Sequence, residues 1–562
     1  MSNRYIRALL GIAAVLCVAG ARSASAAATC GDLNGSGARD PGDAVRLNLA
    51  INVGANAADC GASGSLQCGD LNQDATLNVQ DLVFLVQLLS NQETLLAPCT
   101  SFGTVQCGGS LSGQITSNRV IQGPPTCTSV TQVDGTTIVN PNVVLTVQPG
   151  ARIAGKKTST DTTPSVLVFL RDAKINAPGT AAQPILFTSD QALAVGGPGG
   201  DLGDWGGIVL NGRAPVNFPG GVGNSEGLPP GQGLFGGNEP NDSSGVLRFA
   251  RIEFSGIEFS TDNELNVLTQ NGLGRGTTID HVQTNAGNDD CFEWFGGTIR
   301  SKFLVATSCR DDNFDWQIGW TGGLQFGLVY QNASIDNTTG RHAIEADNNE
   351  FGFNNEPRSN PNVCNVTAIG SVRQAAGGGR SGANLRRGTA GKIYNTLFMD
   401  FGAGCLDIDN TETLQQACDG VGLKTTEPRL RVQNVKCFNT GADQSTGSAT
   451  GGPAFCPTAD DLYDAWGTAG LIDPANNTDP GTDPELGGVP AGTAGGITAT
   501  FPASVDDRYF PALGDLGATS CGLEPGFFDA APYIGAFEPG GSTGSGDNWL
   551  VTTGGWINFS VD

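Results

Sequence analysis

The segments DDCFEWFGG (residues 289–297) and DDNFDWQIG (residues 311–319) repeat one pattern of two aspartates, a Phe, an acid and a Trp after 22 residues. In a solenoid with one coil per repeat, equivalent residues of successive coils lie above one another at the inter-strand spacing of about 4.8 Å. Like side chains then stack on like. The repeat therefore predicts that the two segments are equivalent strands in neighbouring coils.

Side chains alternate between the two faces of a strand, which assigns a direction to each residue of the repeat. Phe292 and Trp294 share one face, and the Phe and Trp of the second segment repeat them one coil later. We expect these aromatic side chains to point inward. Asp289, Glu293, Asp311 and Asp315 are then expected to point outward, on the outer wall of the solenoid.

Short apolar alternations continue through residues 129–440, as in NVVLTVQPGARIAG, SGVLRFARIEFSG and GKIYNTLFMDFG. In each predicted strand, apolar residues recur at every second position, and the strand ends at Gly, Pro or Asn. A flat β-sandwich is the alternative for such a pattern. The stacked repeat favours a mostly β protein whose residues 129–440 form a right-handed parallel β-helix. Residues 100–128 are then expected to form a linker and the N-terminal cap.

Composition restricts the possible partners of the protein. Its 562 residues include 83 Gly and carry a net charge of -25, which opposes binding to nucleic acid and favours binding of cations such as Ca²⁺.

Residues 1–26 have Arg4 and Arg7, an apolar run and a small-residue triplet, as in a secretory signal peptide. No later apolar run is long enough to span a membrane. We therefore expect a secreted protein at the bacterial cell surface, with most of its later cysteines in disulfides.

Residues 30–99 contain two oxygen-rich loops, each followed by apolar residues at helical spacing. The side chains recur at positions 1, 3, 5, 9 and 12 of a calcium loop, and position 7 offers a backbone carbonyl. The predicted Ca²⁺ ligands are Asp32, Asn34, Ser36, Arg39 (carbonyl), Asp40 and Asp43 in the first loop, and Asp70, Asn72, Asp74, Thr76 (carbonyl), Asn78 and Asp81 in the second.

This pair of loops resembles type I dockerins, which bind cohesins or tether secreted bacterial enzymes. The resemblance covers residues 30–99 and implies a small α-helical, calcium-binding module before the β-helix, with a cohesin-like module as a possible partner. The chain departs from the dockerin pattern at Ala75, where a Gly normally makes the turn, and in the distance of 38 residues between the repeats.

A continued register adds AIEAD (residues 343–347) and CLDID (residues 405–409) to the repeat. The acids then form a column that provides the candidate catalytic residues Glu293, Asp315, Glu345 and Asp407. Carboxylates about 5 Å apart repel one another, so a proton, a cation or water must lie between them.

Three interpretations of this column remain open. Carboxylates one coil apart match the spacing of about 5 Å in a retaining glycosidase. Alternatively, Asp289, Asp290, Asp311 and Asp312 form a second metal or substrate site beside the column, with Lys302 or Arg310 as the base of a lyase. The third interpretation is a solvated acidic ladder that only stabilises the fold.

The chain also resembles a family of secreted bacterial β-helix proteins, many from Bacteroidetes, that have no established activity. The matching segments include TVQPGARIAG, GDWGGIVLNGRAP, GTTIDHVQTNAGNDDCFEWFGG and DNWLVTTGGWINF. The resemblance extends from about residue 110 to the end and implies secretion and the β-helix fold. It implies no catalytic residue.

These observations predict a protein that binds or scaffolds at the cell surface, towards polysaccharide or another extracellular protein. The alternative is a polysaccharide lyase or glycoside hydrolase tethered by the dockerin-like module. His281 and His342 are expected to be structural, because their separation is no metal-ligand spacing. Residues 441–562 are expected to form long loops and the C-terminal cap.

Overall fold

The computed structural model describes residues 104–157, 164–197, 199–260, 263–332, 335, 341–370, 381–419, 424–438, 444–445, 521, 526–531, 533–537, 549 and 556–557. The chain divides into two compact units, Met1–Val105 with Asn118–Val120, and Gln106–Ser117 with Ile121–Asp562. Only residues 104, 105 and 118–120 of the first unit are described. The predicted signal peptide and dockerin-like module therefore lie outside the described residues.

The second unit contains a parallel β-helix, so the flat-sandwich alternative is wrong. One face consists of short strands that pair in parallel with the equivalent strand of the next coil. These strands are β7 (Val166–Phe169), β10 (Ile208–Asn211), β16 (Leu268–Asn271), β18 (Phe292–Phe295), β20 (Phe314–Gln317), β22 (Ile344–Ala346), β24 (Ser381–Leu385), β26 (Gly404–Ile408) and β28 (Gln444–Ser445).

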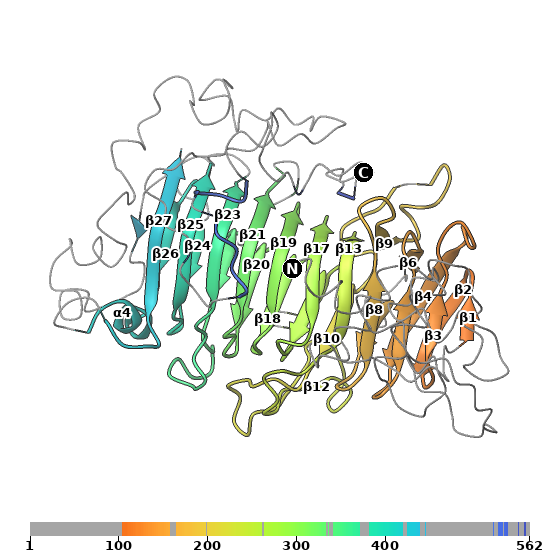
Figure 1. Ribbon diagram of the computed structural model, residues 1–562, viewed down its shortest axis with the longest axis horizontal. Helices are drawn as coiled ribbons and strands as arrows, with labels where there is room; N and C mark the ends of the chain where they lie inside the picture. The colour runs from red at the N-terminus through yellow and green to blue at the C-terminus, as the bar shows by residue number, and fades with distance from the viewer. Residues whose placement is uncertain are drawn as a thin grey trace, which may run out of the picture. The chain divides into compact units, whose positions relative to one another are not determined.

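Longer strands alternate with the short ones along the chain and also pair in parallel from coil to coil. Figure 1 shows them side by side as arrows of one direction. They are β13 (Gly245–Glu253), β17 (Thr278–Asn285), β19 (Arg300–Thr307), β21 (Gly323–Tyr330), β23 (Asn362–Ile369), β25 (Gly391–Met399) and β27 (Leu430–Phe438).

The remaining described elements are further strands and one helix. The strands are β1 (Thr104–Gln106), β2 (Gly109–Ile115), β3 (Arg119–Ile121), β4 (Val130–Val139), β5 (Val144–Val147), β6 (Arg152–Gly155), β8 (Lys174–Pro178), β9 (Ile185–Ser189), and two antiparallel pairs, β11 (Gly223–Asn224) with β12 (Leu234–Phe235) and β14 (Ile257–Ser260) with β15 (Asn263–Leu265). Among the described residues the single helix is α4 (Thr411–Ala417), as expected for a Gly-rich, turn-rich chain.

Each long strand from β13 to β25 bends at one residue that has left-handed backbone geometry. In β13 this residue is Phe249, and in β17 it is His281, with φ of 43° and 52°. The pairing of the two strands skips both residues, since Arg248 pairs with Asp280 and the next pair is Ala250 with Val282. One half of β13 pairs with β8 and the other with β9, so the bend divides each long strand between two faces. Each coil therefore has three faces.

The core confirms the predicted stacking of the repeat. Phe292 pairs in register with Phe314, and Trp294 with Trp316. All four side chains are buried inside the coils, and the Phe292 and Phe314 rings lie 5.7 Å apart. Trp294 also stacks on Trp320 at 4.6 Å. Full burial of such a side chain contributes about 2 to 3 kcal/mol to folding.

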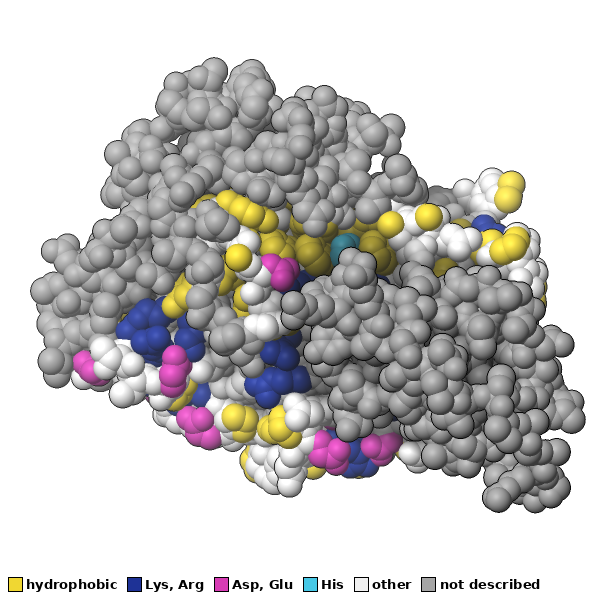
Figure 2. Space-filling view, in the orientation of Figure 1, with side chains coloured by type: hydrophobic (Ala, Val, Ile, Leu, Met, Phe, Trp, Pro, Cys, Tyr) yellow, Lys and Arg dark blue, Asp and Glu magenta, His cyan; other side chains and the backbone are white. Residues whose placement is uncertain are grey.

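A second apolar cluster lies outside the coils, on the face of the long strands. Its members on β19, β21, β23 and β25 pack against described residues of the C-terminal segment, among them Ile534, Trp549 and Trp556. Figure 2 shows apolar side chains in yellow gathered over this part of the face. The described C-terminal residues thus cover the side of the β-helix, and the rest of the predicted cap over residues 441–562 lies outside the described residues.

Disulfides join parts of the described chain, as the cysteine usage predicts. They link Cys107 with Cys127, Cys291 with Cys309, and Cys364 with Cys521. The last of these fixes the C-terminal segment to β23. Within the described residues, no helix has both the length and the apolar character needed to cross a membrane.

Candidate functional site

The predicted acidic column exists on the face of the short strands. Glu293 on β18 pairs in register with Asp315 on β20, which in turn pairs with Glu345 on β22. One position of the column was missed, because Asn384 on β24 pairs with Glu345 and separates it from Asp407 on β26. The column therefore reads Glu, Asp, Glu, Asn, Asp along five coils.

A second column runs beside the first, just before each short strand. Asp290 precedes β18 and Asp312 precedes β20, and the backbone N–H of Asp312 donates to Oδ1 of Asp290 at 2.8 Å. One coil later the equivalent residue is His342, whose backbone N–H donates to Oδ1 of Asp312. The two columns bring together three groups of possible metal ligands.

The ligand atoms of each group lie within 4.8 Å of one another. The groups are Asp289 with Asp290 and Asp311, Asp290 with Glu293 and Asp315, and Asp312 with His342 and Glu345. The first two offer only carboxylate oxygens, the ligands that Ca²⁺ prefers. The third adds an imidazole nitrogen from His342.

The acids point away from the core, as expected, but the interpretation of a solvated acidic ladder does not fit their burial. Glu293 is only 4 % exposed, and Asp315 and Glu345 are each 8 % exposed. They point away from the core but line a polar cavity of about 180 Å³. Glu226, from the loop between β11 and β12, and Glu264 on β15 form part of its wall. These loops remove the column from bulk water.

Hydrogen bonds hold the carboxylates in place at the centre of the cavity. Gln317 donates to Oε1 of Glu293 at 2.9 Å, and Asn266 donates to its other oxygen. Oδ1 of Asp315 is buried and has no hydrogen-bond partner. A buried carboxylate oxygen without a donor costs free energy unless a cation or a proton satisfies it. This atom therefore marks a place for a ligand.

Burial and mutual repulsion raise the pKa of the central carboxyl groups. The pKa of Asp290, Glu293 and Asp315 rises well above its usual range. Burial is the largest cause of the rise in each case, and repulsion by the neighbouring carboxylates adds to it. The pKa of Asp289 is raised in the same way by burial and by Asp311. The site holds more negative charge than it can keep ionised without a cation.

Two arginines border the acids at one end of the cavity. Arg386 forms an ion pair with Glu345, and its Nε lies 2.9 Å from Oδ1 of Asp347. Arg387 lies 2.7 Å from the other oxygen of Asp347. Burial still raises the pKa of Asp347 to about 7, although Arg387 lowers it. The alignment of AIEAD with the repeat could have indicated Asp347, whereas only the fold brings the arginines here.

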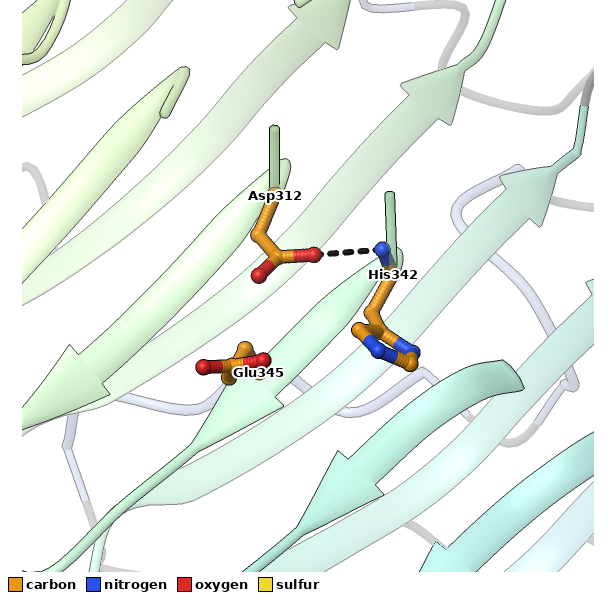
Figure 3. Close-up of side chains that lie close together, drawn as sticks. All are labelled: Asp312, His342 and Glu345. Atoms are coloured by element: carbon orange, nitrogen blue, oxygen red, sulfur yellow. Dashed lines mark hydrogen bonds between the residues drawn. The ribbon is translucent and has the colours of Figure 1, made fainter. Parts of the chain in front are cut away.

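A second cavity, of about 470 Å³, continues along the columns. Asp312, His342, Glu345, Asn384 and Asp407 line it, together with Arg386. Figure 3 shows Asp312, His342 and Glu345 side by side on neighbouring coils. Asp407 therefore belongs to this cavity and does not line the smaller one. A signal for His342 existed in the sequence, since RHAIEA aligns with DDNFDW of the repeat.

The predicted lyase bases lie elsewhere. Lys302 on β19 forms an ion pair with Asp529 at 2.7 Å and lies over the ring of Phe527, among the long strands. Arg310 donates to Asn288 and lines neither cavity. His281 stacks between Phe249 and Phe303, which confirms its structural role.

A long parallel β-helix with buried carboxylates along one face defines the class of this protein. Residues 114–458 match the family described as pectate-lyase like beta helix domain, and the chain belongs to this family. No curated protein and no solved structure matches the chain.

Proposed function

We propose that the protein binds Ca²⁺ at the acidic columns and, through the cation, an acidic polysaccharide. The observation that carries this proposal is the group Asp290, Glu293 and Asp315, whose oxygens lie within 4.8 Å of one another. Three buried carboxylates at that separation need a cation or protons. Their oxygen ligands suit Ca²⁺, which accepts irregular coordination geometry, better than Mg²⁺, which demands near-ideal octahedral geometry.

The polysaccharide follows from the family and from the charge of the site. A pectate-lyase-like domain supports a role with polysaccharides. The acids would repel a uronate chain, but a bound Ca²⁺ can bridge protein and uronate carboxylates. Arg386 and Arg387 offer planar donors for a further carboxylate. Binding at the cell surface or scaffolding, rather than catalysis, is the role that this arrangement serves.

Secretion and the calcium loops of residues 30–99 complete the proposal. The dockerin-like module would bind Ca²⁺ separately and attach the β-helix to a cohesin-like or other extracellular protein. Calorimetry on residues 29–100 tests this part independently. No calcium uptake by that fragment would contradict it, and the site on the β-helix would be unaffected.

Binding to polygalacturonate in calcium buffer and in EDTA tests the main proposal. We expect retention on the polysaccharide in calcium only. Asp315→Asn should weaken the retention at least tenfold, because it removes one charge and a ligand oxygen. Asp529→Asn is the matched control, since Asp529 lies 62 % exposed on another face. Equal retention of both variants, or retention in EDTA, would contradict the proposal.

A polysaccharide lyase or glycosidase is the second candidate. Burial lowers the pKa of Arg386, a cation beside Glu345 that could contact a substrate. The closely spaced carboxylates also approach the separation in retaining glycosidases. Assays for unsaturated uronates and for new reducing ends separate this candidate from simple binding. Product that is lost in Asp315→Asn but kept in Asp529→Asn would establish catalysis at the columns.

A further inference from the structure

The second cavity differs chemically from the calcium site that we propose. One coil further along the columns, Asp312 takes the place of Asp290, and Glu345 takes that of Asp315. His342 then stands where the next aspartate of the column would be. Asp312, His342 and Glu345 thus come together as a group that draws two members from the second column, and one of these supplies a nitrogen ligand.

The imidazole of His342 is held as metal-binding histidines commonly are. Its Nδ1 lies 3.1 Å from the carbonyl oxygen of Ser381. A carbonyl oxygen only accepts, so Nδ1 carries the proton and Nε2 keeps the lone pair. Such a backbone partner fixes the tautomer and the orientation of a ligating imidazole.

An independent observation indicates that this cavity takes a ligand. Oδ1 of Asn384 is buried without a hydrogen-bond partner, and the side chain is 7 % exposed. Asn384 pairs in register with Glu345 and lines the same cavity. Oδ1 of Asp407, one coil further, is also buried and unpartnered. These oxygens lie beside the cluster, and water or a cation is needed to satisfy them.

We infer that Asp312, His342 and Glu345 bind a divalent transition metal ion in preference to Ca²⁺, with Asn384 next to the ion. Imidazole suits Zn²⁺ and related ions, whereas Ca²⁺ takes oxygen ligands. One oxygen of Glu345 already pairs with Arg386, so Glu345 would ligate through the other. The cavity of about 470 Å³ leaves room for water or a substrate group on the ion.

Zinc binding by the whole protein, without a histidine tag and in excess calcium, tests this inference. We expect one Zn²⁺ to remain after dialysis, and Co²⁺ in its place to show a visible absorption band. His342→Gln should weaken zinc binding at least tenfold and abolish the Co²⁺ band. His281→Gln is the matched control, because His281 lies between Phe249 and Phe303 and should keep both properties.

Two further variants keep the test decisive should His342→Gln fold poorly. Asn384→Asp adds a carboxylate beside the ion and should tighten zinc binding several-fold, whereas Glu345→Gln should weaken it. Asp315→Asn should reduce calcium-dependent polysaccharide retention and leave zinc in place. The inference is overturned if calcium displaces the zinc, if no zinc is retained, or if the His342 and His281 variants bind zinc equally.

Discussion

Single residues show why acids can lie buried on a β-helix. Glu293 and Asp315 occupy outward positions of their strands, as the alternation of the repeat requires. They are nevertheless buried, because loops from other coils fold over them. Their ionisation is therefore linked both to folding and to whatever cation they bind.

A pH dependence follows from these carboxyl groups in the calcium-free protein. The pKa of Asp290, Glu293 and Asp315 is raised by burial in the folded chain, and the pKa of Asp347 is raised to about 7. A raised carboxyl pKa stabilises the fold below the unfolded value of about 4, and this contribution is lost as pH rises through the folded value. We expect the Tm in EDTA to fall between about pH 5 and pH 8.

Calorimetry in EDTA and in calcium measures this dependence. Calcium should raise the Tm most at pH 8, because the cation then replaces the lost protons. Asp315→Asn should flatten the profile in EDTA, since it removes one of the titrating groups. A Tm that increases with pH through this window would contradict the assignment.

A core residue tests the stacking of the coils. Trp294 is fully buried and stacks on Trp320, so Trp294→Ala leaves a large cavity between coils. We expect the free energy of unfolding to fall by about 3 to 5 kcal/mol. Chemical denaturation measures the change. Phe351→Ala is the control, because Phe351 is 81 % exposed, and its stability should stay within about 0.5 kcal/mol of the parent.

At the scale of elements, the bent long strand is the unit that closes each coil. Non-glycine residues adopt positive φ at every bend from Phe249 to Asn395. Isolated residues disfavour this geometry by about 1 to 2 kcal/mol. Packing in the folded coil therefore has to hold it, as the stacking of Phe249, His281 and Phe303 does on the outside. No short-range sequence pattern predicts a bend of this kind.

Close approach between strands makes one glycine indispensable. Gly245 begins β13 with φ of 109°, and a Cβ there would lie 1.8 Å from the carbonyl oxygen of Ile175 on β8. Gly245→Ala should destabilise the protein by more than about 3 kcal/mol, through both strain and the clash. Gly113→Ala is the control, because Gly113 has φ of 60° but no atom within 4 Å of the added Cβ.

The two alanine variants separate the two causes. Thermal unfolding of Gly113→Ala should show only the conformational cost of about 1 to 2 kcal/mol. If both variants lost the same stability, the close pairing of β8 and β13 would be in doubt.

At the scale of the whole β-helix, stability is built from contacts between neighbouring coils. The C-terminal segment is an exception among the described residues, since it crosses several coils on the face of the long strands. Cys364 and Cys521 join this segment to β23 across a sequence separation of 157 residues.

Removal of this disulfide tests the role of the segment. The double variant Cys364→Ser and Cys521→Ser should lose about 2 to 4 kcal/mol and bind an apolar dye more strongly, because Trp549 and Trp556 are held less firmly on the sheet. Calcium-dependent polysaccharide retention should persist, since the acidic columns lie on the face of the short strands. Unchanged dye binding would show that the apolar contacts suffice alone.

The sequence by itself determined the parallel stacking of residues 289–297 on 311–319, because a repeat in phase with the coil reports which side chains lie above one another. It also determined the column of Glu293, Asp315 and Glu345. Only the tertiary structure decided that these acids are buried, that Asn384 interrupts the column and that Arg386 pairs with Glu345. Coils of unequal length and the loops between them bring distant residues together, and local periodicity contains no information about such contacts.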